Sequence, residues 1–427
     1  MKTTRREMLL AMGAGVLALP HVARAQTGVQ TGAHVVVVGG GFGGATAARY
    51  LRRADPGLRI TLIEPQQRFA TCPFSNLYLG GLRDWDSITH GYEGLRAAGI
   101  EVIHARAEDV DGAARSVTLS DGTRLGWDRL VLSPGIDFRW GELAGYDEAA
   151  AELAPHAWKA GAQTQLLRAQ LEAMEDGGTF VMVVPEGAFR CPPGPYERAS
   201  MVAHYFKTHK PRSKILILDS QDKFSKQPLF QQGWQAHYGE MIEWVGQSDD
   251  GLVVEVDASA REAVTAFGTR HKAGVLNVIP PQKAGVIAER AGVTDQTGWV
   301  PVVAERFEST LVPGIHVLGD ATIAAPMPKS GFCANAQAKV AAAAIAADLA
   351  GREPPPASFA NTCYSLIAPG WGISVAGVYR ALDGKVVEVE GAGGVSPLDA
   401  GPEFRRAEAD YGAGWYASIC ADIWGAA

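Results

Sequence analysis

The sequence predicts an α/β fold of two Rossmann-like domains followed by a small C-terminal α+β domain. An apolar run at 34–38 leads into a glycine-rich loop and then a helical pattern. A second α/β unit begins with the apolar run 179–184, and another apolar run ends at Gly319-Asp320. Apolar strands that alternate with helical segments are typical of parallel sheets covered by helices.

The segment 33–64 has the spacing of a dinucleotide-binding unit. Gly39, Gly41 and Gly44 give G-x-G-x-x-G between a strand and a helix, and Glu64 closes the unit. In this motif the glycines allow a tight turn, close approach to a pyrophosphate and close packing of helix on strand. The phosphates would lie at the helix N-terminus, and Glu64 would accept hydrogen bonds from ribose hydroxyls. A plain glycine-rich loop is the alternative, but the complete unit favours dinucleotide binding.

The N-terminus predicts export. Arg5-Arg6 precedes an apolar stretch at 9–19, and Ala23-Arg24-Ala25 offers a cleavage site, as in a twin-arginine signal peptide spanning 1–25. The alternative, a membrane anchor, would need roughly 20 apolar residues. We therefore expect a periplasmic protein with no membrane span.

The composition is that of an ordinary globular protein, with 427 residues, 47% hydrophobic content and a net charge of −7. Loss of the signal peptide removes more basic than acidic residues and makes the charge more negative. Nucleic-acid binding is therefore not expected.

The chain divides into a signal peptide and three domains. We predict an FAD-binding domain in two parts, a second Rossmann-like domain between them, and a C-terminal domain that packs on the flavin, arranged as in glutathione reductase. Their bounds are 1–25 for the signal peptide, 32–145 and 280–350 for the first domain, 146–279 for the second and 357–427 for the last.

Two segments indicate that the dinucleotide is FAD. The strand that ends in Gly319-Asp320 places a carboxylate where it can bond a ribityl hydroxyl, and Gly319 allows close approach. In the second domain, the loop 184–194 lacks the glycine fingerprint, and Pro192 and Pro193 have no N–H groups for a phosphate. We therefore expect FAD and no NAD(P)H.

The chain has five cysteines, an odd number for an exported protein. Cys72 follows the second strand and could reach the flavin ring; its alternative role is as a packed thiol. Cys191 precedes one predicted helix, and Cys333 lies in the first turn of another, where the dipole favours a thiolate. They form either a redox-active pair or two unrelated buried thiols. Cys363 and Cys420 have no evident chemistry.

Together these motifs resemble the flavoprotein subunit of flavocytochrome c sulfide dehydrogenase and related flavoproteins of periplasmic sulfur oxidation. The resemblance covers essentially the whole mature chain. It rests on the twin-arginine leader and on the segments 37–44, 71–76, 190–198, 319–320, 329–333 and 361–365.

The resemblance implies the roles of three cysteines and the reaction. Cys72 would carry FAD through the flavin 8α carbon, and Cys191 and Cys333 would form a disulfide beside the ring. Hydrosulfide would open this bridge, leaving a persulfide and a thiolate, with Cys333 the expected thiolate. Electrons would pass through FAD to a c-type cytochrome on another chain, since no C-x-x-C-H haem motif occurs here.

Two other functions remain open. A sulfide:quinone oxidoreductase would use the same flavin and cysteines, but residues 401–427 show no clear lipid-facing pattern. A non-turnover role, as a persulfide carrier or as an accessory that reactivates a sulfur-carrier protein, is the third hypothesis.

Overall fold

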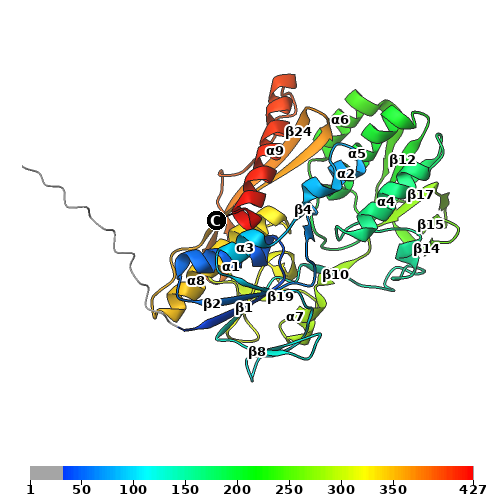
Figure 1. Ribbon diagram of the computed structural model, residues 1–427. Coiled ribbons are helices and arrows are strands. Elements are labelled where there is room, and N and C mark those ends of the chain that lie inside the picture. Colours follow the sequence, from blue (N-terminus) through cyan, green and yellow to red (C-terminus); the bar gives the residue numbers. More distant parts are fainter. Residues whose placement is uncertain (1–31, 427) are drawn as a thin grey trace, which may run out of the picture.

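The computed structural model describes residues 32–426 (Figure 1), so the predicted signal peptide lies outside the described residues. It confirms the mixed α/β fold. Within the described range, no helix combines the length and apolarity needed to cross a bilayer.

The first domain is built on a sheet with the order β22-β19-β20-β21-β9-β1-β2-β5. β1 pairs in parallel with both β2 and β9, and Val35, Val36 and Val37 are 0% exposed. An uninterrupted run of valines suits such a strand, because helices or loops cover both faces of a parallel sheet. Its strands are β1 (His34–Val38), β2 (Arg59–Ile63), β5 (Glu101–Ile103), β9 (Arg129–Leu132), β19 (Val300–Val303), β20 (Glu308–Ser309), β21 (Ile315–Val317) and β22 (Thr322–Ile323).

Two helices from opposite ends of this domain pack against each other. They are α1 (Phe42–Ala54), which follows the glycine-rich loop, and α8 (Gly331–Leu349). A buried bond from Asn335 Nδ2 to Thr46 Oγ1, 2.9 Å long, joins them. Smaller elements complete the domain: α2 (Ser75–Leu79), α3 (Glu93–Ala97), α7 (Val286–Arg290), β3 (Phe69–Ala70), β4 (Thr89–His90), β6 (Ala107–Asp111), β7 (Ser116–Leu119) and β8 (Arg124–Gly126). β7 and β8 pair as a hairpin that turns at Asp121-Gly122.

The second domain, green in Figure 1, has a parallel sheet of order β13-β12-β11-β17. Its strands are β11 (Thr179–Val184), β12 (Lys214–Asp219), β13 (Ile242–Val245) and β17 (Val275–Val278). Its helices are α4 (Ala162–Ala173), α5 (Gly194–His209) and α6 (Gln227–Tyr238), and a small meander comprises β14 (Val253–Asp257), β15 (Glu262–Thr265) and β16 (Arg270–Lys272). The two chain crossings between the domains pair as an antiparallel ribbon of β10 (Ile136–Phe138) and β18 (Gln282–Ala284).

The C-terminal domain has two long strands and a long helix. They are β23 (Ser358–Ala368), β24 (Trp371–Leu382) and α9 (Pro402–Trp424), with β25 (Lys385–Glu388) and β26 (Gly394–Val395) pairing with β24. β23 and β24 pair in an antiparallel hairpin. β23 contacts both α5 and α8, so it spans the two other domains.

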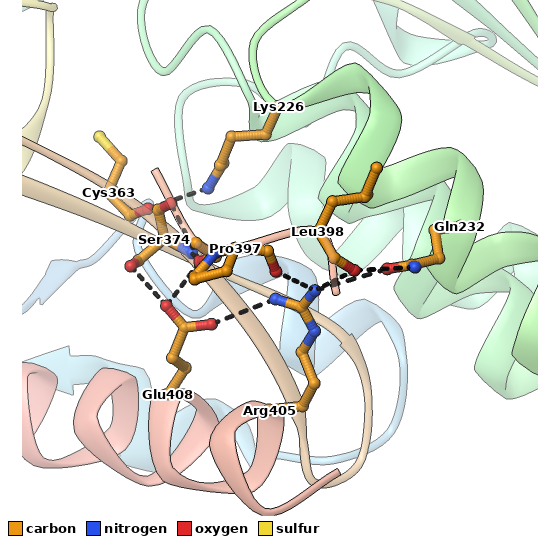
Figure 2. Close-up of polar contacts among 9 residues, drawn as sticks. Lys226, Gln232, Cys363, Ser374, Pro397, Leu398, Arg405 and Glu408 are labelled. Carbon is orange, nitrogen blue, oxygen red and sulfur yellow. Dashed lines mark hydrogen bonds and ion pairs between the residues drawn. The ribbon is translucent and has the colours of Figure 1, made fainter. Parts of the chain in front are cut away.

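A buried ion pair holds α9 in place. Arg405 is 0% exposed, and its Nη1 lies 3.5 Å from Glu408 Oε2. Glu408 Oε1 accepts hydrogen bonds from Ser374 on β24 and from Ser396, and Arg405 Nη2 donates to the carbonyl oxygen of Pro397 (Figure 2). One turn of α9 is thereby bound to both β24 and the loop after β26.

Candidate active site

A cavity of about 660 Å³ opens where the carboxyl ends of β1 and β2 meet the segment after β21. Ligands of open α/β sheets bind at this edge of the strands. We call it the large cavity. Among its lining residues are Gly39, Gly41, Glu64, Cys72, Arg190 and Asp320.

Close backbone contacts require two glycines of the fingerprint, Gly39 and Gly44, and the third, Gly41, faces an aromatic ring. Gly39 has φ +99°, and a Cβ there would lie 2.3 Å from the Ser133 carbonyl oxygen. A Cβ on Gly44 would lie 1.9 Å from the Gly39 carbonyl oxygen, so only glycine lets α1 approach β1 this closely. A Cβ on Gly41 would meet the Phe69 ring at 3.0 Å. All three positions therefore keep the loop tight beside the cavity.

Glu64 is fixed by the loop that it faces. Its Oε2 accepts the Gly40 N–H at 2.7 Å and its Oε1 accepts the Gln66 N–H at 2.9 Å. Burial raises the pKa of Glu64 and these N–H groups oppose that rise. Each oxygen keeps a lone pair for a ribose hydroxyl, so the side chain positions the loop and still faces the cavity.

Asp320 is the second polar group that a cofactor would meet. Its Oδ1 is buried and has no hydrogen-bond partner, while its Oδ2 lies 3.9 Å from Arg190 Nη1. Burial raises the pKa of Asp320, and the positive charges of Arg190 and Lys329 lower it. A buried carboxylate oxygen without a partner is costly. A ribityl hydroxyl in the cavity would satisfy it, so the residues fit FAD.

Cys72 lies where the large cavity meets a smaller one. It lines both, as does Arg190. Its Sγ–H donates to the carbonyl oxygen of Trp158 over 3.5 Å, and the same oxygen accepts a hydrogen bond from Arg190. The next turn contains Phe74 at φ +69°. The structure thus places the Cys72 sulfur at one end of the predicted cofactor site.

The smaller cavity, about 100 Å³, contains three of the five cysteines. We call it the cysteine cavity. Cys72, Cys191 and Cys363 line it together with Trp158, Glu197 and Arg198. Cys191 has φ +57°, and its N–H donates to the Lys329 carbonyl oxygen at 2.8 Å. Strained backbone at a reactive residue is common at functional sites.

The structure does not group Cys191 with Cys333, the pair that the sequence analysis expected. Both cysteines precede or begin a helix as predicted, but Cys333 lines a separate cavity of about 320 Å³. Cys363 takes its place in the cysteine cavity, because β23 crosses the starts of α5 and α8. All five cysteines are free thiols in the structure.

Burial opposes the helix dipole that the sequence analysis expected to favour a thiolate at Cys333. Its N–H bonds the Ser330 side chain, which caps α8, but burial raises the pKa of Cys333. Burial likewise raises the pKa values of Cys191 and Cys363. Removal from water therefore outweighs the helix dipole, which is worth only about 0.3–1 kcal/mol at exposed sites.

Charged residues surround the cysteine cavity, and sequence reasoning missed them. Arg198 is 1% exposed, burial lowers its pKa to about 9, and it donates to backbone carbonyl oxygens and to the side chains of Asn76 and Asn277. Glu197 accepts the Asn76 side-chain N–H and the Leu366 N–H, each at 2.9 Å, and burial raises its pKa. A signal for Cys363 was present, because residues 361, 363 and 365 of an extended segment lie on one face of the strand.

The fold, the large cavity and the adjoining thiols define the class of this protein as an FAD-dependent oxidoreductase. Residues 33–177 match the pyridine nucleotide-disulphide oxidoreductase family. Residues 164–280 match the central domain of the sulfide dehydrogenase (flavocytochrome c) flavoprotein chain, and residues 355–424 match the flavocytochrome c sulphide dehydrogenase flavin-binding domain. The chain belongs to the family of flavocytochrome c sulfide dehydrogenase flavoprotein chains, and its cofactor is FAD.

The individual relatives include a flavocytochrome c flavoprotein chain and sulfide:quinone oxidoreductases. The sulfide dehydrogenase (flavocytochrome c) flavoprotein chain of Chlorobaculum thiosulfatiphilum is 67% identical over 42 residues, which are 10% of this chain and 88% of that one. The mitochondrial sulfide:quinone oxidoreductase of Mus musculus is 22% identical over 311 residues, 67% of this chain and 65% of its own length, so this chain spans just under two thirds of it. The crystal structure of the sulfide:quinone oxidoreductase from Aquifex aeolicus has the same fold, with a TM-score of 0.70, 19% identity and coverage of 91% of this chain and 92% of that one.

Proposed function

We propose that the protein is a sulfide dehydrogenase that oxidises sulfide to sulfur or polysulfide and passes the electrons to a c-type cytochrome. One observation carries the proposal. The cysteine cavity and the large cavity share Cys72 and Arg190, so a pair of thiols lies next to the place where FAD fits. Family membership supports sulfide as the substrate.

We assign the redox pair to Cys191 and Cys363, in place of Cys191 and Cys333. When this pair is oxidised, hydrosulfide attacks one sulfur, the S–S bond breaks, and its electron pair stays on the other sulfur as a thiolate. A second hydrosulfide attacks the outer sulfur of the persulfide, the bond from that sulfur to Cys191 breaks, and the sulfur leaves as polysulfide while Cys191 becomes a thiolate. The Cys191–Cys363 bond then re-forms, which releases an electron pair. FAD held in the large cavity would supply the acceptor for this pair and could pass the electrons on one at a time.

We assign a role to each residue that lines the FAD site. Gly39, Gly41 and Gly44 keep the loop open to the pyrophosphate, and Glu64 would accept ribose hydroxyls. Asp320 would bond the ribityl chain, and Cys72 would hold the flavin covalently.

Intact-protein mass spectrometry tests the covalent bond: denatured protein should keep the mass of one FAD, and Cys72→Ala should lose it. Flavin released freely from the wild-type protein would refute the link.

The contacts of Asp219 in the second domain support a reaction that does not use NAD(P)H. Asp219 ends β12, where a nucleotide-binding domain places its ribose-binding acid. Here its Oδ2 accepts hydrogen bonds from Tyr196 at 2.6 Å and Trp244 at 2.9 Å, and the Tyr196 ring stacks 3.6 Å from Phe224. The Asp219 carboxylate is therefore hydrogen-bonded within the second domain itself.

The electron acceptor separates this proposal from a sulfide:quinone oxidoreductase, which the names of the Mus musculus and Aquifex aeolicus relatives favour. Purified protein should be mixed with sulfide and either oxidised cytochrome c or a quinone analogue. Reduction of cytochrome c supports our proposal. Faster turnover with quinone assigns the alternative, and turnover with neither favours the accessory or persulfide-carrier role.

We also propose that the protein is periplasmic, exported with its cofactor by the twin-arginine route. The support is the arginine pair and the cleavage site within 1–25, which lie outside the described residues. The mass of the protein isolated from the periplasm tests this: it should correspond to a chain that begins after Ala25.

A further inference from the structure

Lys226 is a buried lysine that the reaction proposed above does not yet use. It is 8% exposed and has φ +62°, directly before α6. A lysine seldom occupies this left-handed region, and its burial is costly unless the amino group has partners. Both features require a compensating interaction.

The partners of Lys226 belong to the strand that carries Cys363. Its Nζ donates to the carbonyl oxygen of Cys363 at 2.9 Å and to Ser365 Oγ at 2.8 Å. Figure 2 shows the side chain reaching from the start of α6 to Cys363. Within residues 32–426, no carboxylate oxygen forms an ion pair with it at 4.0 Å or less. The amino group therefore lies beside the cysteine with only neutral hydrogen-bond partners.

The charged groups that face this lysine come from several elements. Glu197 on α5, Glu408 on α9 and the thiolates of Cys191 and Cys363 all raise the pKa of Lys226, which burial lowers. In return, Lys226 is the charge that most lowers the pKa of Cys363, with the Asn361 side chain acting in the same direction and Glu197 against it. An ammonium and a thiolate here stabilise each other against burial.

The charges near Cys191 have a different net effect on its pKa from those near Cys363. Glu197 and the Cys363 thiolate both raise its pKa, and they act more strongly than Lys226 and Arg190, which lower it. The backbone N–H of Cys191 donates to the carbonyl oxygen of Lys329, whereas the carbonyl oxygen of Cys363 accepts from Lys226. The two thiols of the pair therefore differ in their access to a fixed positive charge.

We propose that Lys226 is a positioning residue of the redox pair: its amino group, anchored on Cys363 and Ser365, selects Cys363 as the sulfur that becomes the thiolate. The inference rests on the proposed function and adds a direction to it. Hydrosulfide sulfur bonds to Cys191 Sγ, the Cys191–Cys363 bond breaks, and its electron pair stays on Cys363 Sγ. No further oxidant takes part in this step.

Site-resolved alkylation tests the proposal without sulfide. The reduced full-length holoprotein is treated with iodoacetamide between pH 6 and 10, and mass spectrometry follows Cys191 and Cys363 separately. In the wild type, Cys363 should react at lower pH than Cys191. Lys226→Met should slow Cys363 roughly tenfold or more at pH 7.5, because loss of a nearby opposite charge shifts a pKa by about 1–3 units.

Two further variants separate electrostatics from folding. Lys226→Arg should restore most of the Cys363 reactivity. Lys210→Met is the matched control, because Lys210 in the same domain also donates two hydrogen bonds, in its case to the backbone carbonyl oxygens of Glu172 and Met174; it should leave both cysteines unchanged. Equal Cys363 profiles in the wild type and Lys226→Met would overturn the proposal. If Lys226→Met does not fold, a wild type in which Cys191 ionises first overturns it equally.

The position of the added sulfur gives a second measurement. One equivalent of sulfide is added to the oxidised protein, and the persulfide is alkylated and located. Sulfur on Cys191 supports the proposal, and sulfur on Cys363 contradicts it. A protein that shows the expected alkylation profiles but never forms a persulfide would retain the thiolate assignment and lose the sulfide dehydrogenase function, so the two failures are distinguishable.

Discussion

The backbone N–H of Cys191 donates to the carbonyl oxygen of Lys329 over 2.8 Å, and this bond joins the loop before α5 to the loop before α8. The starts of two helices from different domains are thereby held together. β23 then crosses both, which brings Cys363 into the same cavity as Cys191. The site thus depends on how three domains pack.

The assignment of the pair predicts different results for two cysteine variants. Cys363→Ala should reduce sulfide oxidation to background, because the bridge to Cys191 can no longer form. Cys333→Ala should retain turnover, since Cys333 lines another cavity. Steady-state assays with sulfide measure both, and Cys420→Ala serves as a control outside the cysteine cavity. The reverse pattern would restore the Cys191–Cys333 pair.

Asp320→Ala should weaken FAD binding. The substitution removes the buried oxygen that we expect to bond the ribityl chain, and a hydrogen bond to a charged group contributes about 1.5–3 kcal/mol, roughly tenfold or more in Kd. The measurement is flavin retained after dialysis, in a Cys72→Ala background so that a covalent bond does not hide the loss. Asp121→Ala, at the exposed hairpin turn, should keep its flavin. Equal retention in both variants would exclude this role for Asp320.

Gly44→Ala should destabilise the first domain. The added Cβ would lie 1.9 Å from the Gly39 carbonyl oxygen, so α1 and the loop must separate. Overpacking of this kind costs about 1–3 kcal/mol. Chemical denaturation measures the free energy of unfolding. Gly414→Ala in α9 is the control: a Cβ there meets nothing within 4 Å, and alanine favours a helix, so its stability should be equal or slightly higher.

Arg405→Met should destabilise the C-terminal domain by about 3–5 kcal/mol, because it leaves Glu408 buried without its cation. The double variant Arg405→Met, Glu408→Leu should be less destabilised than Arg405→Met alone, since no unpaired charge remains. Urea unfolding of both variants measures the difference. A double variant as unstable as the sum of the two single variants would show that the two charges are not coupled.

Stability should fall in mild acid because of His156. Burial lowers the pKa of His156 to about 3, and its Nδ1 accepts the Trp158 N–H at 2.9 Å, which requires the neutral ring. The unfolded state binds the proton near pH 6.5, so this contribution is complete above that pH and is lost progressively toward pH 3. At pH 5 the loss is about 2 kcal/mol. In His156→Asn, the change in unfolding free energy between pH 8 and pH 5 should be smaller by about that amount; an unchanged difference would contradict the assignment.

The sequence by itself determined the local features of the site. The glycine spacing, Glu64 and Gly319-Asp320 define the cofactor cavity, because strand, loop and helix follow one another along the chain. The helix starts at Cys191 and Cys333 were also predicted from neighbouring residues. Local backbone geometry needs only local sequence.

Only the tertiary structure decided which thiols meet. Cys363 lies on a strand far along the chain, and its place beside Cys191 follows from β23 packing across α5 and α8. The positions of Glu197, Arg198 and Lys226 depend on the same packing. The pKa of each thiol was likewise decided by burial between domains, a property that no short segment of sequence contains.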